Sequence, residues 1–303
     1  MKVNSREMIR KIRMDIGVSQ EDLAEQLYIS QRQLSRIETG EKNLDIWQFM
    51  TLMELAGLPT EDFWLLYMDT KDYDDYRTYK RIKGLVWEDK FSEARVLLEE
   101  LEKTTLSNHP FIRQFIAHYK IETDSEMPRE QVIEELTKVM HMSKPSFDES
   151  KISEYRLNYN EIGIITGIAV SAAALGDVDR SVALHEAIIS NRKNIRASDD
   201  DKARLLPNLM TNLTTILGRA GRYRESLKYC YEALDVCRLY GKFRQLPSIL
   251  VNIASGYRLL GEEESVYRPY LNRAYQCALG IGDKRQIDAI KKTAEESFGI
   301  KDL

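Results

Sequence analysis

The residues whose types and spacing could do chemistry are the polar side chains of one short segment near the N-terminus. Residues 19–40 read SQEDLAEQLYISQRQLSRIETG, in which Gln, Arg and Ser are interspersed with Leu and Ile at helical spacing. In the major groove of DNA, a Gln side chain can pair bidentately with adenine and an Arg side chain with guanine. The segment therefore has the chemistry of a surface that reads base edges.

Two short helices joined by a tight turn must position these side chains. Ser19 can cap the first helix, whose opening turn is acidic as the helix dipole favours, and Ser30 can cap the second, which we expect over residues 31–39. Gly40 is well placed to end the second helix. The spacing predicts inward apolar faces of Leu23, Ala24 and Leu27 in the first helix and of Leu34 and Ile37 in the second, and an outward face of Gln31, Arg32, Ser35 and Arg36.

The run S-Q-x-x-L-A-x-x-L-x-I-S-x-x-x-L-S-x-I-E-x-G closely resembles the helix-turn-helix of phage-repressor-like (XRE/Cro type) DNA-binding domains, over about residues 5–65. The alternative is a generic helical hairpin whose Gln and Arg side chains are only solvated. The fixed spacing of the matching positions argues against it. The resemblance implies DNA contacts by Gln20, Ser30, Gln31, Arg32, Ser35, Arg36, Lys42 and Asn43.

Two positions of the resemblance bear on the local structure. The family often pairs the positions of Arg13 and Glu38, which ties the first helix of the domain to the recognition helix; otherwise both side chains are simply exposed. The family usually has glycine in the turn where this chain has Tyr28. A residue other than glycine costs about 1 kcal/mol in a left-handed conformation, so we expect a strained or differently shaped turn.

Composition places the chain among helical globular proteins. Of its 303 residues, 43% are hydrophobic and 30% charged, with only 7 Pro and 15 Gly. No apolar run reaches the ~18 residues of a membrane span, and the N-terminus lacks the apolar core of a signal peptide, so we expect a cytoplasmic protein with no membrane partner. The net charge is −4 and residues 1–68 are also net acidic. Tight binding to DNA should therefore depend on dimerisation.

No pattern in the sequence indicates catalysis, a metal site or a cofactor. The four His residues are far apart and lack HExxH or Cys/His spacing, and there is no Gly-rich phosphate loop. Cys230 and Cys237 lie on one helix face, and together with Cys277 they form no metal or redox motif. We expect buried free thiols and a protein that is not an enzyme.

From Tyr79 onward the pattern becomes a repeat. Similar turns begin at Asp89, Gly176, Gly221 and Gly261. Seven positions before each of the last three turns is a small residue, which lets two helices approach closely: Ala169, Thr214 and Ala254. The pattern resembles the tetratricopeptide repeat (TPR), a helix–turn–helix unit of nominal period 34, and predicts about five units including a degenerate one over about residues 109–142. Such units form a solenoid with a concave face; the alternative is an unrelated helical bundle.

The expected fold class is all-α. A five-helix phage-repressor-like domain over residues 1–68 should be followed by a helical connector over residues 69–80 and a TPR-like α-solenoid over residues 81–303, which binds peptide and dimerises. The N-terminal domain should have further helices over residues 5–16 and 45–56 and a last one beyond them. The aromatic residues of that last helix are expected in the core or at a domain junction: Phe63, Trp64 and Tyr67.

In this repeat class the first helix of each unit lines the concave face, and an Asn nine residues before the turn often holds a peptide backbone. One carboxamide can both donate to a carbonyl and accept from an amide. Asn212 and Asn252 occupy this position, whereas the unit of Gly176 has Gly167 there. With a neighbouring Asn on the same face and two Arg near the helix ends, the candidate peptide-binding residues are Asn208, Asn212, Asn252, Arg219 and Arg258. The alternative is that each Asn is hydrogen-bonded within its own bundle.

A phage-repressor-like domain followed by a five-repeat solenoid resembles the peptide-responsive quorum-sensing regulators of Gram-positive bacteria, the Rgg/PlcR/PrgX group, which is related through the solenoid to the Rap proteins. The segment HPFIRQF, residues 109–115, is a further similarity to PlcR-type proteins. The resemblance implies a homodimeric transcriptional regulator that binds a double-stranded operator with two half-sites and is gated by a short signalling peptide on the concave face. Two alternatives stay open: gating by a protein partner of the anti-repressor type, and a Rap-like signalling protein that acts through protein contacts.

Overall fold

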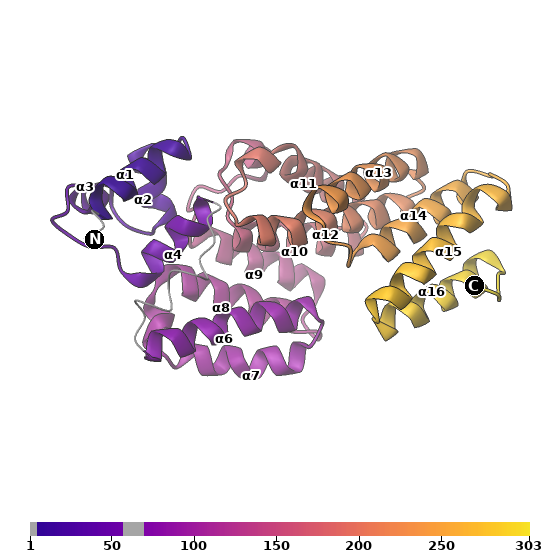
Figure 1. Ribbon diagram of the computed structural model, residues 1–303, viewed down its shortest axis with the longest axis horizontal. Coiled ribbons are helices and arrows are strands. Elements are labelled where there is room, and N and C mark those ends of the chain that lie inside the picture. Colours follow the sequence, from indigo (N-terminus) through magenta and orange to yellow (C-terminus); the bar gives the residue numbers. More distant parts are fainter. Residues whose placement is uncertain (1–4, 57–69) are drawn as a thin grey trace. The chain divides into compact units, whose positions relative to one another are not determined.

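The computed structural model describes residues 5–56 and 70–303, and within these ranges the chain is a succession of helices joined by turns and irregular segments (Figure 1). The expected all-α fold class is confirmed. Extended residues pair at an isolated parallel bridge between Asn158 and Arg196. No helix in the described ranges has both the length and the apolar character needed to cross a bilayer.

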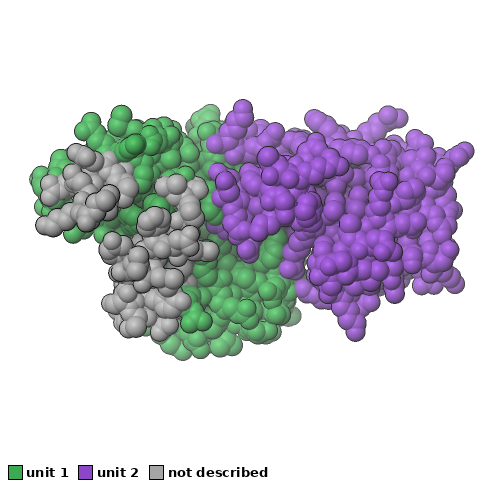
Figure 2. Space-filling model, viewed as in Figure 1, with its two compact units in different colours: residues 1–168, 194–198 green, residues 169–193, 199–303 purple. Residues whose placement is uncertain are grey.

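The chain divides into two compact units (Figure 2). The first unit contains residues 1–168 and also residues 194–198. The second contains residues 169–193 and 199–303. The short segment 194–198 therefore belongs to the first unit, although both of its flanks belong to the second.

The N-terminal part of the first unit has four described helices around one apolar core: α1 (Ser5–Asp15), α2 (Gln20–Gln26), α3 (Gln31–Glu38) and α4 (Ile46–Leu55). The core side chains include Leu23, Ala24 and Leu27 of α2 and Leu34 and Ile37 of α3, as their spacing predicts. Helix α4 corresponds to the helix expected over residues 45–56. The last predicted helix of this domain, with Phe63, Trp64 and Tyr67, lies outside the described residues.

The first turns of α2, α3 and α4 have the same reciprocal hydrogen bonds. Ser19, Ser30 and Asp45 each accept a hydrogen bond from the backbone N–H three residues on, and the side chain at that third position accepts from the backbone N–H of the capping residue. Each cap of this kind stabilises its helix by about 1 kcal/mol. Gly40 follows α3 with a positive φ of 79°, which glycine adopts without strain.

The rest of the first unit is built from helical hairpins. Helices α6 (Thr70–Trp87), α7 (Phe91–Glu102) and α8 (Pro110–Glu122) pack successively against one another, and α9 (Arg129–His141) packs against α8 (Figure 1). Helix α10 (Tyr159–Ala174) passes from the first unit into the second. Helices α8 and α9 occupy the segment in which the degenerate repeat is predicted.

The residues predicted as a connector do not stand apart from the repeats. The described part of the segment 69–80 is helical, as expected, and it is the first half of α6. Its Tyr79 is buried in a second apolar core with Phe115 of α8. Trp47 and Met50 of α4 belong to this same core. The N-terminal domain and the first hairpins therefore share apolar packing.

The second unit is a run of helices in which each packs against the next: α11 (Val178–Ser190), α12 (Asp199–Arg219), α13 (Tyr223–Tyr240), α14 (Leu246–Leu259), α15 (Glu264–Ile281) and α16 (Lys284–Phe298). Helices α12 and α14 also touch, as first helices of adjacent repeats do in a solenoid. The predicted small residues are all buried: Ala169, Thr214 and Ala254. The described residues of the two units also include three short 3₁₀ segments: η1 (Thr105–Asn108), η2 (Glu149–Glu154) and η3 (Arg192–Asn194).

The repeat turns require a left-handed residue. Gly176, Gly221 and Gly261 have φ of 91°, 76° and 87°. Asp89 occupies the equivalent place after α6 with φ of 56°, a conformation that Asp tolerates better than most residues. The turn alignment made from the sequence therefore corresponds to one shared backbone conformation.

Candidate nucleic-acid interface and its attachment to the repeat helices

Helix α3 presents a polar face to solvent. Because Leu34 and Ile37 are buried, the opposite side of the helix carries the exposed side chains of Gln31, Arg32 and Arg36. Among the described residues Arg32 has no hydrogen-bond or ion-pair partner, whereas Arg36 Nε lies 3.1 Å from Glu41 Oε2. The remaining predicted DNA contacts are also at the surface, with Ser30, Lys42 and Asn43 exposed and Ser35 and Gln20 half-buried. The geometry fits insertion of α3 into a groove.

The recognition helix is braced from behind by an ion pair. Arg13 Nε donates to Glu38 Oε1 at 2.6 Å, and Arg13 Nη2 donates to Glu38 Oε2 at 3.2 Å. The two side chains are only 13% and 5% exposed, so the pairing of these positions expected from the resemblance is confirmed. Gln20 Nε2 donates to Glu38 Oε2 at 2.7 Å. The amide nitrogen of Gln20 is thus engaged inside the domain, and its DNA contact stays a prediction for the amide oxygen and the backbone.

Disrupting this brace should lower the free energy of unfolding. Burial raises the pKa of Glu38, but the hydrogen bonds from Arg13 and Gln20 and the charge of Arg13 outweigh it and hold the pKa below the ordinary 4.5. The stabilisation is therefore complete above pH 4.5 and is lost as the pH falls further, through the lowered folded-state pKa. Glu38→Gln should lower the free energy of unfolding by about 2–3 kcal/mol at pH 7. It should also reduce the further loss of stability below pH 4.5. Urea unfolding at pH 7 and below pH 4.5 measures both effects.

A matched control for this variant is available on the same face of the domain. Glu41 pairs with Arg36, but both side chains are more than half exposed. Exposed pairs contribute about 0–1 kcal/mol, so Glu41→Gln should leave the unfolding midpoint almost unchanged. Equal effects of the two substitutions would contradict the bracing role of Glu38.

Tyr28, in the turn between α2 and α3, attaches this domain to α8. Its φ is 55°, so the left-handed conformation expected at a glycine position is confirmed. The Tyr28 hydroxyl donates to Gln114 Oε1 at 3.2 Å, and the ring meets those of His109 and Phe111 edge-on, with centroids 6.3 and 6.4 Å away. A glycine could make none of these contacts. The backbone strain at Tyr28 is therefore offset by packing against the repeat helices.

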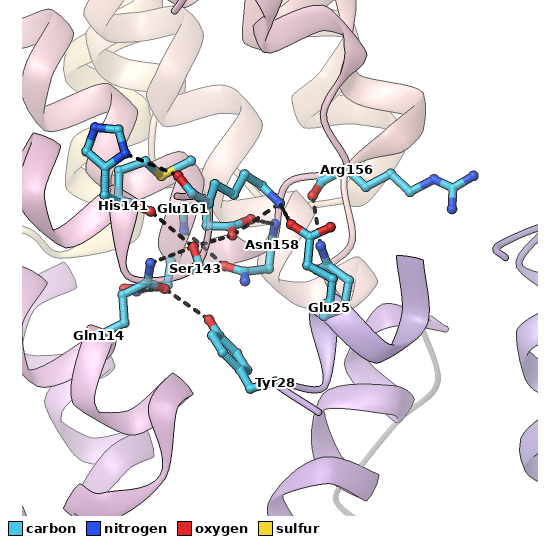
Figure 3. Close-up of polar contacts among 12 residues, drawn as sticks. Glu25, Tyr28, Gln114, His141, Ser143, Arg156, Asn158 and Glu161 are labelled. Carbon is cyan, nitrogen blue, oxygen red and sulfur yellow. Dashed lines mark hydrogen bonds and ion pairs between the residues drawn. The ribbon is translucent and has the colours of Figure 1, made fainter. Parts of the chain in front are cut away.

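Gln114 is the buried centre of this attachment (Figure 3). Its Oε1 accepts from Tyr28 and from Asn160 Nδ2, the latter at 3.1 Å. Its Nε2 donates to Val139 O at 3.1 Å and to Ser143 Oγ at 2.7 Å. Every hydrogen-bonding position of the carboxamide is occupied, so the side chain is fixed and presents its oxygen to Tyr28 in one direction.

Ionic contacts also hold the side of α2. Arg156 Nη1 lies 2.6 Å from Asp22 Oδ2, and Arg156 Nη2 donates to Gly17 O at 3.2 Å. Lys144 Nζ lies 3.4 Å from Glu25 Oε1. Gln26 Nε2 donates to the carbonyl of Arg156 at 3.3 Å. The repeat region therefore supplies two cations to the acidic face of α2.

Sequence reasoning missed this attachment, although two signals pointed to it. Tyr28 departs from the glycine of the family, and the segment 109–115 was singled out only as a similarity. In the structure, His109, Phe111 and Gln114 of that segment all contact Tyr28. The partners Lys144 and Arg156 carry no comparable signal, because they lie in irregular segments more than a hundred residues from α2.

The predicted peptide-binding residues differ in their surroundings within the second unit. Asn252 Nδ2 donates to Thr214 Oγ1 at 2.9 Å and to Thr215 Oγ1 at 3.1 Å. Asn208 Oδ1 accepts from Gln245 Nε2 at 3.1 Å. These two Asn side chains are thus hydrogen-bonded within the bundle, as the alternative interpretation held, and each keeps only part of its capacity for a ligand.

Three other candidates are open. Asn212 on α12 is half-buried and has no hydrogen-bond partner among the described residues. Arg219 is exposed and likewise unpaired within the described part of the chain. Arg258 is exposed and its guanidinium lies 5.4 Å from the ring centroid of Phe298. Asn212 is therefore the candidate best placed to bind a peptide backbone.

The thiols and metal-binding side chains form no reactive site in the described ranges. Cys230 and Cys237 are buried and free, and burial raises the pKa of each thiol to about 11. Cys277 is half-buried and free. No three His, Cys, Asp or Glu side chains of residues 5–56 and 70–303 converge as metal ligands would.

The chain is similar to known proteins both in its N-terminal helices and over its whole length. Residues 9–63 match the helix-turn-helix domain family. PlcR of Bacillus thuringiensis, solved in complex with the peptide PapR7 and DNA, is 19% identical, with 94% of this chain and 98% of that chain covered and a TM-score of 0.63. ComR of S. thermophilus, solved with DNA and its signalling peptide ComS, is 18% identical, with 96% and 98% covered and a TM-score of 0.60.

A ComR from Streptococcus vestibularis, in complex with its cognate signalling peptide XIP, is 13% identical over 96% of this chain and 97% of that chain, with a TM-score of 0.54. Among curated protein sequences nothing matches. At these identities the similarity shows a shared fold. The resemblance to the Rgg/PlcR/PrgX group is confirmed at that level: the chain carries a helix-turn-helix domain followed by the solenoid-like helical region of the PlcR and ComR structures.

Proposed function

We propose that the chain is a sequence-specific DNA-binding transcriptional regulator whose activity is gated by a short signalling peptide bound to the repeat region. The observation that carries the proposal is the exposed Gln/Arg face of α3, braced by the Arg13–Glu38 pair within a helix-turn-helix domain. The similar PlcR and ComR structures contain DNA and a peptide, which supports both kinds of ligand.

The active form proposed here is a cytoplasmic homodimer on an operator with two half-sites. Residues 1–68 carry more acids than bases, so one domain has little of the phosphate neutralisation that drives DNA binding. Two copies held at a fixed spacing add their contacts and read a palindrome one or more helical turns long. Dimerisation therefore supplies the affinity that one domain lacks.

An electrophoretic mobility shift tests the DNA-binding part. The probe is the DNA upstream of the chain's own gene, and the competitor is unrelated DNA of equal length. We expect a shift at low salt that the competitor does not abolish. No shift at low salt would overturn the proposal and favour a Rap-like protein that acts through protein contacts.

The gating ligand can be identified from protein purified from its host. Native mass spectrometry of that protein should show a dimer that retains a peptide-sized mass. Because Asn212 is the open carboxamide of α12, Asn212→Ala should lose that mass, whereas Asn272→Ala, at an exposed position on α15, should keep it. A retained protein in place of a peptide would favour gating of the anti-repressor type.

A further inference from the structure

Glu41 differs from the other charged side chains around α3. Residues 27–43 contain two acids, Glu38 and Glu41. The Glu38 side chain is 5% exposed and paired with Arg13, whereas the Glu41 side chain is 61% exposed. A surface that meets the phosphates of DNA gains affinity from cations and loses affinity from acids. The carboxylate of Glu41 therefore opposes general binding to DNA.

The stability of α3 does not account for an acid at this position. Glu41 follows shortly after Glu38, the last residue of α3, and the carbonyl groups at the C-terminal end of a helix repel an anion. Its ion pair with Arg36 joins two side chains that are more than half exposed, and such pairs contribute little to stability. A role for Glu41 must therefore come from what its carboxylate does to Arg36.

Both oxygens of the Glu41 carboxylate are held at the end of α3. Arg36 Nε donates to Glu41 Oε2 at 3.1 Å, and Thr39 Oγ1 donates to Glu41 Oε1 at 3.4 Å. The backbone brings these groups together, because the N–H groups of Glu41 and Lys42 both donate to Arg36 O, at 2.8 and 3.2 Å. The carboxylate thus binds the Arg36 guanidinium as a phosphate oxygen would.

A DNA phosphate and a guanine edge would meet different electrostatics at Arg36. Both can accept hydrogen bonds from a guanidinium, and both must displace the Glu41 carboxylate. The hydrogen bond from Thr39 keeps the displaced carboxylate close by. Like charges a few ångströms apart repel each other even in water. A phosphate at Arg36 is therefore opposed by Glu41, whereas an uncharged guanine edge is not.

We propose that Glu41 is a specificity-determining residue, which competes with DNA phosphates for Arg36 and releases Arg36 to a guanine edge. A protein can gain specificity by disfavouring the wrong partner as well as by favouring the right one. Glu41 supplies the first of these effects, and the unpaired Arg32 supplies the second. The inference rests on the proposed function, because it requires DNA at the outward face of α3.

The test is fluorescence anisotropy of the full chain over a series of KCl concentrations. The probes are a duplex from the DNA upstream of the chain's own gene and a scrambled duplex of the same composition. Glu41→Gln should strengthen binding to the scrambled duplex by up to about fivefold and binding to the upstream duplex by less. Because Arg36 then becomes a phosphate contact, the salt slope with the scrambled duplex should steepen by about 1.

Two comparisons separate this role from the loss of one negative charge. Asp15→Asn removes the same charge at an exposed position at the end of α1, and it should leave the ratio of the two affinities unchanged. In an Arg36→Ala background, Glu41→Gln should no longer steepen the salt slope. A ratio that Glu41→Gln does not change, or that Asp15→Asn changes equally, would overturn the inference and leave the proposed function standing. A parent protein that binds neither duplex at low salt would overturn both.

Discussion

Arg32→Ala should weaken sequence-specific DNA binding by about 1–3 kcal/mol, the range for an arginine that reads a guanine edge. Arg32 is the second residue of α3, and the first residues of a recognition helix are those that contact base edges. Because Arg32 has no partner in the described part of the chain, no internal bond must break when it meets DNA. Arg36 must first leave Glu41, so Arg36→Ala should cost less.

The measurement is fluorescence anisotropy with the operator and with a scrambled duplex of the same length. Arg32→Ala should lower the affinity ratio between the two, while Lys42→Ala, an exposed residue just after α3, should weaken both equally and reduce the salt slope by about 1. Circular dichroism should be unchanged for both variants. An unaltered affinity ratio for Arg32→Ala would show that Arg32 does not contribute to the recognition of the DNA sequence.

The sequence was sufficient for features that depend on neighbours within one or two helical turns. Ser19 and Ser30 cap their helices and Leu34 and Ile37 face inward because capping and amphipathicity are local properties. The repeat turns were found for the same reason, since glycine or Asp89 in a left-handed conformation leaves a local sequence signature. The fold class follows from such local signals.

Contacts between distant segments could not be predicted in this way. The bond from Tyr28 to Gln114 and the bond from Arg196 to Ile16 depend on how helices pack, and neither residue type nor spacing specifies such a partner. Asn212 and Asn252, which occupy equivalent positions in their repeats, show that spacing alone does not specify a partner. Asn252 is bound by Thr214 and Thr215 of α12, whereas Asn212 meets no such pair. Equivalent positions in a repeat therefore differ in availability for a ligand.

The outward face of α3 and the α2 side of the helix-turn-helix therefore have different roles. The outward face of α3 follows from sequence and is specified locally, so it can vary with the operator without disturbing the fold. The α2 side and Tyr28 are specified by the repeat helices. If the proposed function holds, a change of effector response should arise at residues that contact α2, such as Arg156, and a change of DNA sequence preference at residues such as Arg32.

Lowering the pH from 7 to 5 should reduce the free energy of unfolding by about 2 kcal/mol for each of two buried histidines. His118 and His185 are almost fully buried, and burial lowers the pKa of each from 6.5 to about 4. The unfolded chain takes up a proton near pH 6.5 while the folded chain stays neutral. The stabilisation is therefore complete above pH 6.5 and is lost progressively until the pH reaches about 4.

His185 is the cleaner probe of this effect. Its Nδ1 donates to Ser181 O at 2.8 Å, and among the described residues no carboxylate pairs with it, whereas His118 Nε2 lies 3.4 Å from Glu122 Oε2. In urea unfolding, His185→Gln should remove its share of the loss of stability between pH 7 and pH 5. An identical acid dependence in the His185 variant would mean that its imidazole is protonated in the fold. That outcome would require a buried cation in the second unit, where among the described residues only the Ser181 carbonyl accepts from it, so a loss of stability on acidification is the physically expected result.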